Sequence, residues 1–235
     1  MSYKIPGLSR LSDLIGIMLI FILILNINCQ FQVGSVSKAD LLPPRTGRTV
    51  VLGFRPAMSE GEEAGVIRSP LSGAVFMAEP VPPDIPGKMT TKLFSLLRNY
   101  EGYELVDLNK EAGISASFLY SDQGMSEIET FKRIGREFSA ETVMVGYIYR
   151  WQERKGTDYS ADRPASVAFD LYLLRSVDGE VLWKGRFDKT QAPLSENILD
   201  ARTFFKGNGK WMTVESLADL GLSDMLSNSF SDADK

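Results

Sequence analysis

The chain has 235 residues with 26 basic and 30 acidic side chains, and its net charge of −4 argues against a nucleic-acid-binding or anionic-lipid-binding surface. It contains no histidine, which excludes a Ser-His-Asp or Cys-His catalytic arrangement and a zinc site with histidine ligands. We therefore predict that the protein is not an enzyme and that it holds no metal and no cofactor.

Residues 1–28 are predicted to be an export signal. Lys4 and Arg10 precede an apolar run at residues 14–27, and the only cysteine, Cys29, follows that run. The run has 14 residues, whereas a helix that crosses a bilayer needs roughly 20. Basic residues, a short apolar run and then a processing site are typical of a bacterial signal peptide.

Two cleavage sites compete at the end of this segment. In the first, the signal is removed before Cys29 and the thiol takes a diacylglyceryl group, which anchors the protein to a membrane; residues 26–29, Asn-Ile-Asn-Cys, stand where a lipobox would lie. A lone cysteine has no disulfide partner in its own chain, which also favours lipidation. In the second, signal peptidase cuts between Ala39 and Asp40, because the small residues Ser37 and Ala39 occupy positions −3 and −1. An uncleaved membrane anchor is a third alternative.

Beyond the signal, we predict a tether, one globular domain and a polar end. Residues 29–48 contain serine, proline and glycine with no sustained apolar period, and they are expected to be flexible. The domain is expected at 49–226, with a Pro/Gly-rich flap at 55–88 and a helical tail at 189–226. The polar residues 227–235 are expected to be disordered.

The first half of the domain is predicted to contain two strands and two helices. The apolar runs at 49–54 and 103–108 are typical of strands, and within the flap only 73–78 could form one. Thr90 is expected to cap a helix that runs to about Asn99.

The second helix is expected to begin after Ser126. Ser126 and Glu129 form a predicted capping box, in which the hydroxyl accepts from the backbone N–H of Glu129 and the carboxylate reaches back. The helical spacing of the apolar residues that follow predicts one face against a sheet. These residues are Ile128, Phe131, Ile134 and Phe138.

The second half is predicted to contain an antiparallel meander. Alternating apolar residues mark strands at 143–151, 167–174 and 181–187, with a charged loop at 152–163. The dipeptide at 178–179, Asp-Gly, predicts a two-residue type I′ turn.

A last helix, capped by Thr213, completes the expected elements. The fold class is therefore predicted to be α/β (α+β), a mixed sheet with a three-stranded antiparallel meander and helices packed on one or both faces. The inward residues of the last helix would be Val214, Leu217, Ala218 and Leu222.

Aromatic residues of the meander suggest a tentative binding surface at Tyr149, Trp151 and Trp183. At a period of two, such residues are also typical of a buried sheet face. With carboxylates nearby, the alternative function is a secreted peptidoglycan- or carbohydrate-binding protein, and a hydrolase is a weaker alternative. The acids that could pair in space are Asp107, Asp122, Asp170 and Asp188.

Three runs carry a resemblance to a known family: TVVLGF at 49–54, AETVMVGY at 140–147 and DGEVLW at 178–183. Together with the export signal, their order resembles an envelope family. That family includes the curli-secretion lipoprotein, the N-terminal domain of the Tol-Pal translocation protein and the lipoprotein activators of penicillin-binding proteins. The resemblance implies a lipid-anchored, non-enzymatic interaction or assembly module whose partner is another envelope protein or a second copy. The implied location is the periplasm-facing envelope of a Gram-negative-type bacterium, and Gln30 after Cys29 favours the outer membrane.

Overall fold

The computed structural model describes five stretches of the chain, and all of them belong to one compact unit, Gly34–Lys235. The described residues are 47–100, 103–107, 125–157, 161–191 and 211–230. Cys29, Ala39 and Asp40 lie outside the described residues, as does the unit Met1–Val33.

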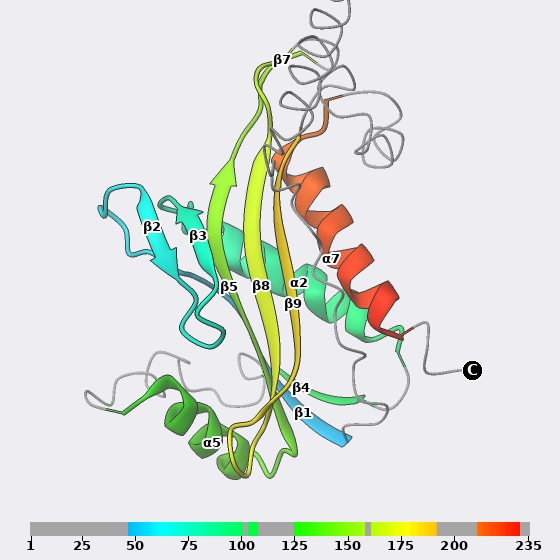
Figure 1. Ribbon diagram of the computed structural model, residues 1–235. Coiled ribbons are helices and arrows are strands. Elements are labelled where there is room, and N and C mark those ends of the chain that lie inside the picture. The colour runs from blue at the N-terminus through cyan, green and yellow to red at the C-terminus, as the bar shows by residue number, and fades with distance from the viewer. Residues whose placement is uncertain (1–46, 101–102, 108–124, 158–160, 192–210, 231–235) are drawn as a thin grey trace, which may run out of the picture. The chain divides into compact units, whose positions relative to one another are not determined.

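A five-stranded mixed sheet with the order β4-β1-β5-β8-β9 forms the centre of this unit (Figure 1). Strand β1 is parallel to both β4 and β5, whereas β5, β8 and β9 form an antiparallel meander. The predicted fold class and the predicted meander are therefore confirmed. The strands are β1 (Gly47–Pro56), β4 (Tyr103–Asp107), β5 (Thr142–Gln152), β8 (Ser166–Arg175) and β9 (Val181–Thr190).

The sheet is covered on both faces because its central strands alternate between two apolar sets. Val167, Phe169 and Leu171 of β8 join one core with helices α2 (Ile85–Leu97) and α7 (Val214–Phe230). Side chains of the opposite face join a second core with helix α5 (Glu127–Glu137) and a hairpin, β2 (Gly65–Arg68) and β3 (Val75–Ala78). Figure 1 shows α2 and α7 together on one side of the sheet, with α5 and the hairpin on the other.

Helix α2 begins five residues before the expected cap. Its first residue is Ile85 and Pro86 lies in its first turn, where the missing N–H of proline removes no helical hydrogen bond. Thr90 therefore does not cap the helix, and the prediction was wrong. Instead, the Thr90 hydroxyl donates to the Pro86 carbonyl at 2.7 Å and accepts from the backbone N–H of Phe54 at 2.8 Å, which ties α2 to β1.

Helix α5 confirms half of the predicted capping box. The Ser126 hydroxyl accepts from the backbone N–H of Glu129 at 3.3 Å, but the Glu129 carboxylate pairs with Lys132 at 2.8 Å. Of the predicted apolar face, Phe131 is buried, whereas Ile128 is 40% exposed.

The Pro/Gly-rich flap contains more regular structure than predicted. The hairpin β2–β3 lies within it, and only its second strand was expected. The charged loop at 152–163 likewise holds a short strand pair, β6 (Lys155–Gly156) and β7 (Ala161–Arg163). Strands β2, β6 and β7 were not predicted because each has four residues or fewer, too few to show a period.

The turn between β8 and β9 is not the predicted two-residue type I′ turn. Of its two diagnostic residues, Gly179 has φ +79° and Asp178 does not have positive φ. The backbone N–H of Gly179 donates to the Arg175 carbonyl, and that of Arg175 to the Glu180 carbonyl, so a longer loop connects the strands. The Asp178 carboxylate holds this loop by accepting from the backbone N–H of Glu180 at 3.0 Å.

Helix α7 begins as predicted and ends later. The Thr213 hydroxyl accepts from the backbone N–H of Ser216 at 3.1 Å, and the four expected inward residues are buried. The helix continues to Phe230, past the expected start of the polar end at 227, and Met225 and Leu226 are buried in the core.

Candidate functional site

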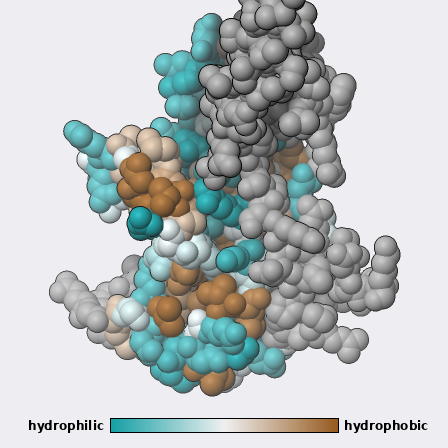
Figure 2. Space-filling model, viewed as in Figure 1, coloured by the Kyte–Doolittle hydropathy of each residue, from teal (hydrophilic) through white to brown (hydrophobic). Residues whose placement is uncertain are grey.

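The outer face of the β2–β3 hairpin carries three exposed apolar side chains. Val66 is 66% exposed, Met77 58% and Val75 45%. Val66 stands directly opposite Met77, and Val75 stands opposite Arg68. Figure 2 shows this apolar patch over the hairpin, with hydrophilic side chains beside it. Soluble proteins place single apolar residues at their surface routinely, but a contiguous group on one rigid element is typical of an interaction surface.

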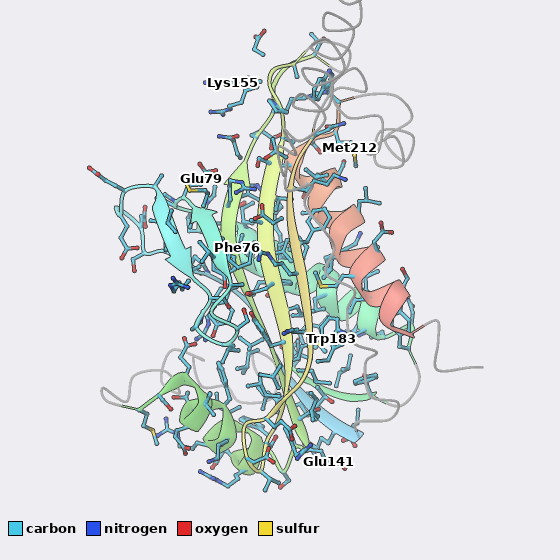
Figure 3. All side chains as sticks on the ribbon, in the orientation of Figure 1. Phe76, Glu79, Glu141, Lys155, Trp183 and Met212 are labelled. Carbon is cyan, nitrogen blue, oxygen red and sulfur yellow. The ribbon has the colours of Figure 1, made fainter. Side chains whose placement is uncertain are left out.

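The inner face of the same hairpin is anchored by Phe76. Phe76 is 1% exposed, and its ring stacks on Tyr149 of β5 with centroids 3.8 Å apart and an angle of 4° between the planes. The guanidinium of Arg186 lies 4.1 Å from the centroid of the Phe76 ring. Figure 3 labels Phe76 where β3 lies over β5.

Three hydrogen bonds that involve the main chain of β3, or of the residue after it, hold this strand on the sheet. Arg186 of β9 donates to the Val75 carbonyl at 3.0 Å, and Arg150 of β5 donates to the Met77 carbonyl at 3.1 Å. Beyond the strand, the backbone N–H of Glu79 donates to the Tyr149 carbonyl at 2.8 Å. The exposed patch therefore stands on a strand that is fixed to the sheet.

A buried polar cluster lies beneath the hairpin turn. One oxygen of the Asp170 carboxylate, Oδ2, accepts from the hydroxyl of Tyr172 at 2.6 Å and from that of Tyr149 at 2.9 Å. The Tyr172 hydroxyl also lies 2.7 Å from the hydroxyl oxygens of Ser69 and Ser72 in the hairpin turn. The other carboxylate oxygen, Oδ1, is buried and has no hydrogen-bond partner among the described residues.

Burial sets the protonation of this cluster. It raises the pKa of Asp170 from 3.8 to about 6, while the hydrogen bonds from Tyr172, Ser69 and Tyr149 and the charge of Arg186 lower it less. Burial, followed by the charge of Asp170, also raises the pKa of the Tyr149 and Tyr172 hydroxyls, so both remain donors at neutral pH. Asp170 is 1% exposed, so a substrate cannot reach the carboxyl in this structure.

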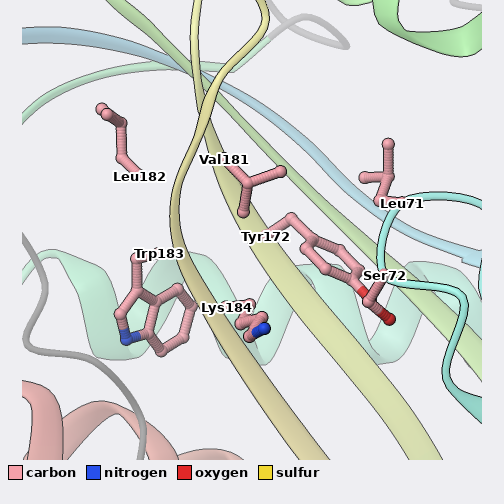
Figure 4. A pocket seen from close by; sticks show the side chains of 7 residues that line it. All are labelled: Leu71, Ser72, Tyr172, Val181, Leu182, Trp183 and Lys184. Carbon is pink, nitrogen blue, oxygen red and sulfur yellow. The ribbon is translucent and has the colours of Figure 1, made fainter.

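A small pocket opens beside the hairpin turn and the start of β9 (Figure 4). Its volume is about 150 Å³, well below the roughly 300–1,000 Å³ of a typical small-molecule site. Figure 4 shows Tyr172 and Trp183 on opposite sides of the β9 ribbon. The lining residues are Leu71, Ser72, Tyr172, Val181, Leu182, Trp183 and Lys184.

The structure does not bring the predicted aromatic surface together. Tyr149 is 0% and Trp183 1% exposed, and they belong to the cores on opposite faces of the sheet. Trp151 is partly buried against the same core as Trp183, because the β5–β8 register shifts between Ile148 and Arg150 and turns Trp151 to the other face. None of the three rings has a free face on a common surface, so the structure gives no support to the carbohydrate-binding alternative.

The sequence analysis did not identify Val66 and Met77, the two most exposed apolar side chains of the hairpin. The available signal was two short apolar runs, at 66–67 and 74–78, which the surrounding prolines and glycines concealed. The described residues contain no group of three or more Cys, Asp or Glu that could hold a metal ion. Among the helices in the described stretches, none is both long and apolar enough to span a membrane.

No family model matches the chain, and no curated protein matches it. Among solved structures, a variant of the PelC dodecamer from Paraburkholderia phytofirmans is 14% identical, with 83% of this chain and 96% of that chain covered and a TM-score of 0.47. Lipoprotein GNA1162 from Neisseria meningitidis is 15% identical over 69% of this chain and 99% of that one, with a TM-score of 0.37. The LpoB C-terminal domain from Salmonella enterica is 15% identical over 63% and 85%, with a TM-score of 0.34.

These similarities are too remote to carry an argument about function. They include a protein named as a lipoprotein, but they do not single out one group of the envelope family that the sequence resembles.

Proposed function

We propose that this chain is an exported, lipid-anchored protein of the bacterial envelope that binds another protein through the outer face of the β2–β3 hairpin, without catalysis. The observation that carries the proposal is the exposure of Val66, Met77 and Val75 on a strand pair fixed to the sheet. A preformed apolar face costs little ordering entropy when a partner covers it. The buried Asp170 and the small pocket offer no comparable site for a substrate.

The anchor in this proposal is a lipid on Cys29, and the protein faces the periplasm of a Gram-negative-type bacterium from the outer membrane. The short apolar run before the only cysteine supports it. Acyl chains stabilise such an anchor by about 0.8 kcal/mol for each buried methylene, so several chains make a stable tether. Tethering would keep the hairpin near other envelope proteins and raise their effective concentration.

Intact mass of the membrane-extracted protein tests the anchor, with Cys29→Ala beside the wild type. We expect a wild-type chain that starts at Cys29 and is heavier by an acylated glyceryl group, which the variant lacks. A chain that starts at Asp40 in both would show ordinary secretion and contradict the lipid anchor.

The double substitution Val66→Ser and Met77→Ser tests the docking face. Because both side chains are mostly exposed, we expect the free energy of unfolding to change by less than about 1 kcal/mol. The complex recovered from membranes by chemical crosslinking should fall at least about tenfold, since two central apolar contacts are lost. The matched control is Val177→Ser, which removes an apolar side chain that is 78% exposed in the β8–β9 loop. Recovery of equal amounts of the complex from the wild type and the double variant would contradict docking through this hairpin.

A further inference from the structure

The charges around the hairpin define the chemistry of its partner, an inference that rests on the proposed function. We infer that the outer face of the hairpin binds a protein surface on which apolar side chains lie beside lysine or arginine residues. The occupant is thus a cationic, partly apolar protein face rather than a lipid surface or a second copy of this chain.

The hairpin and the residues that flank it are strongly acidic. Between positions 59 and 80 there is one basic side chain, Arg68, against four carboxylates, so the local net charge is 1 − 4 = −3. The carboxylates belong to Glu60, Glu62, Glu63 and Glu79.

The register of the hairpin places two of these carboxylates, those of Glu63 and Glu79, at one end of the apolar patch. Gly65 pairs with Ala78 at the end away from the turn, so Glu63 and Glu79 lie just beyond that pair. The next pair toward the turn is Val66 with Met77, and Arg68 lies two pairs further on, opposite Val75. An occupant of the Val66–Met77 position therefore meets carboxylates at one end, and a cation there would match them.

The four carboxylates are not neutralised by the protein. None of them forms an ion pair with any other described residue, and the one hydrogen bond among them is from the backbone N–H of Ser59 to Glu62 at 3.1 Å. A partner cation therefore displaces no existing pair. Exposed charges of this kind raise the association rate and fix orientation more than they raise affinity.

The same charges disfavour the other occupants. The surface of a membrane with anionic lipids is negative and would repel this end of the hairpin. A mature chain from Cys29 has 24 basic and 29 acidic residues, because the signal holds Lys4, Arg10 and Asp13, so a second copy carries a net charge of −5. Like net charge opposes close approach of two copies.

Binding of a defined peptide probe to the purified mature protein tests the inference. The probe is a fluorescent 14-residue helix with leucines on one face and lysines on the other, and anisotropy reports binding as the salt concentration rises. The test variant carries Glu60→Gln, Glu62→Gln and Glu63→Gln. The control variant makes the same change of charge at exposed sites elsewhere, through Glu137→Gln, Glu180→Gln and Glu215→Gln.

We expect the test variant to bind the probe about tenfold more weakly at low salt, with a flatter salt dependence, and the control to match the wild type. The double substitution Val66→Ser and Met77→Ser should weaken binding of the probe as well. Equal loss in the test and control variants, or no loss in the test variant, would overturn the inference. Binding to phosphatidylglycerol vesicles that requires Val66, or a dimer in sedimentation that requires it, would overturn it in favour of a membrane or a second copy.

Failure of this inference is distinguishable from failure of the proposed function. If the membrane complex is lost in the Val66/Met77 double variant but unchanged in the triple Glu→Gln variant, docking through the hairpin stands and the cationic partner face does not.

Discussion

Replacement of Phe76 by alanine is expected to lower the free energy of unfolding by about 3–5 kcal/mol and to abolish partner binding. The ring is 1% exposed, stacks on Tyr149 at 3.8 Å and lies under the Arg186 guanidinium, so its loss leaves a cavity between the hairpin and the sheet. Without this anchor, β3 keeps only the small side chain of Ala78 and its hydrogen bonds as contacts with the sheet, and the outer patch loses its fixed orientation.

Denaturant unfolding measures the loss of stability, and recovery of the crosslinked membrane complex measures the loss of partner binding. The matched control is Phe94→Ala, because Phe94 is 8% exposed but packs in the core on the opposite face of the sheet. We expect the control to lose comparable stability and to retain binding under conditions in which it is folded. A Phe76→Ala protein that is folded and still binds its partner would show that the anchor does not present the docking face.

Asp170→Asn is expected to remove a pH dependence of stability between about pH 4 and pH 6. Burial raises the pKa of the folded carboxyl to about 6 from an ordinary 3.8, so in this range the unfolded chain releases a proton that the folded protein keeps. Raising the pH therefore favours unfolding. The shift corresponds to about 3 kcal/mol of stability that the wild type loses relative to the variant as pH rises from 4 to above 6.

Unfolding of both proteins in urea at a series of pH values measures this difference. The variant amide keeps an oxygen that can accept from Tyr149 and Tyr172, but it places a donor where Oδ1 has no partner, so a constant offset between the curves is expected. The pH dependence of the difference is the informative quantity. Curves that stay parallel from pH 4 to pH 7, or a carboxyl NMR titration of Asp170 with a midpoint near 4, would contradict the raised pKa.

The sheet could be predicted from sequence because its central strands have apolar residues on both faces over ten positions. In β8, Val167, Phe169, Leu171 and Leu173 form one apolar stripe, and Ala168, Tyr172 and Leu174 form a second that Asp170 interrupts; the structure places the two sets in opposite cores. A strand that is buried on both faces appears in the sequence as a nearly continuous apolar run, which predicts a central position in the sheet.

The buried cluster around Asp170 and the position of Trp151 could not be predicted in the same way, because they depend on strand register and on a bulge. Asp170 and Tyr172 share a face at a spacing of two, which the sequence displays, but only the fold brings Tyr149 and the hairpin hydroxyls to them. A one-residue bulge beside Ile148 reverses the face of Trp151, and alternation alone predicts the opposite face. Helix α2 differs from its prediction for another reason, because Pro86 lies in its first turn, whereas the prediction places Pro86 in the Pro/Gly-rich flap.

Site-specific photocrosslinking in living cells tests most directly whether the hairpin is the docking face. A photoreactive amino acid replaces Val66 in one strain and Val177 in another, and the full-length protein is expressed in both. We expect position 66 to give one protein adduct whose crosslinked peptide contains lysine or arginine beside apolar residues, and position 177 to give none. Lipid adducts alone at position 66, or the same adducts at both positions, would contradict docking of a protein partner on the β2–β3 hairpin.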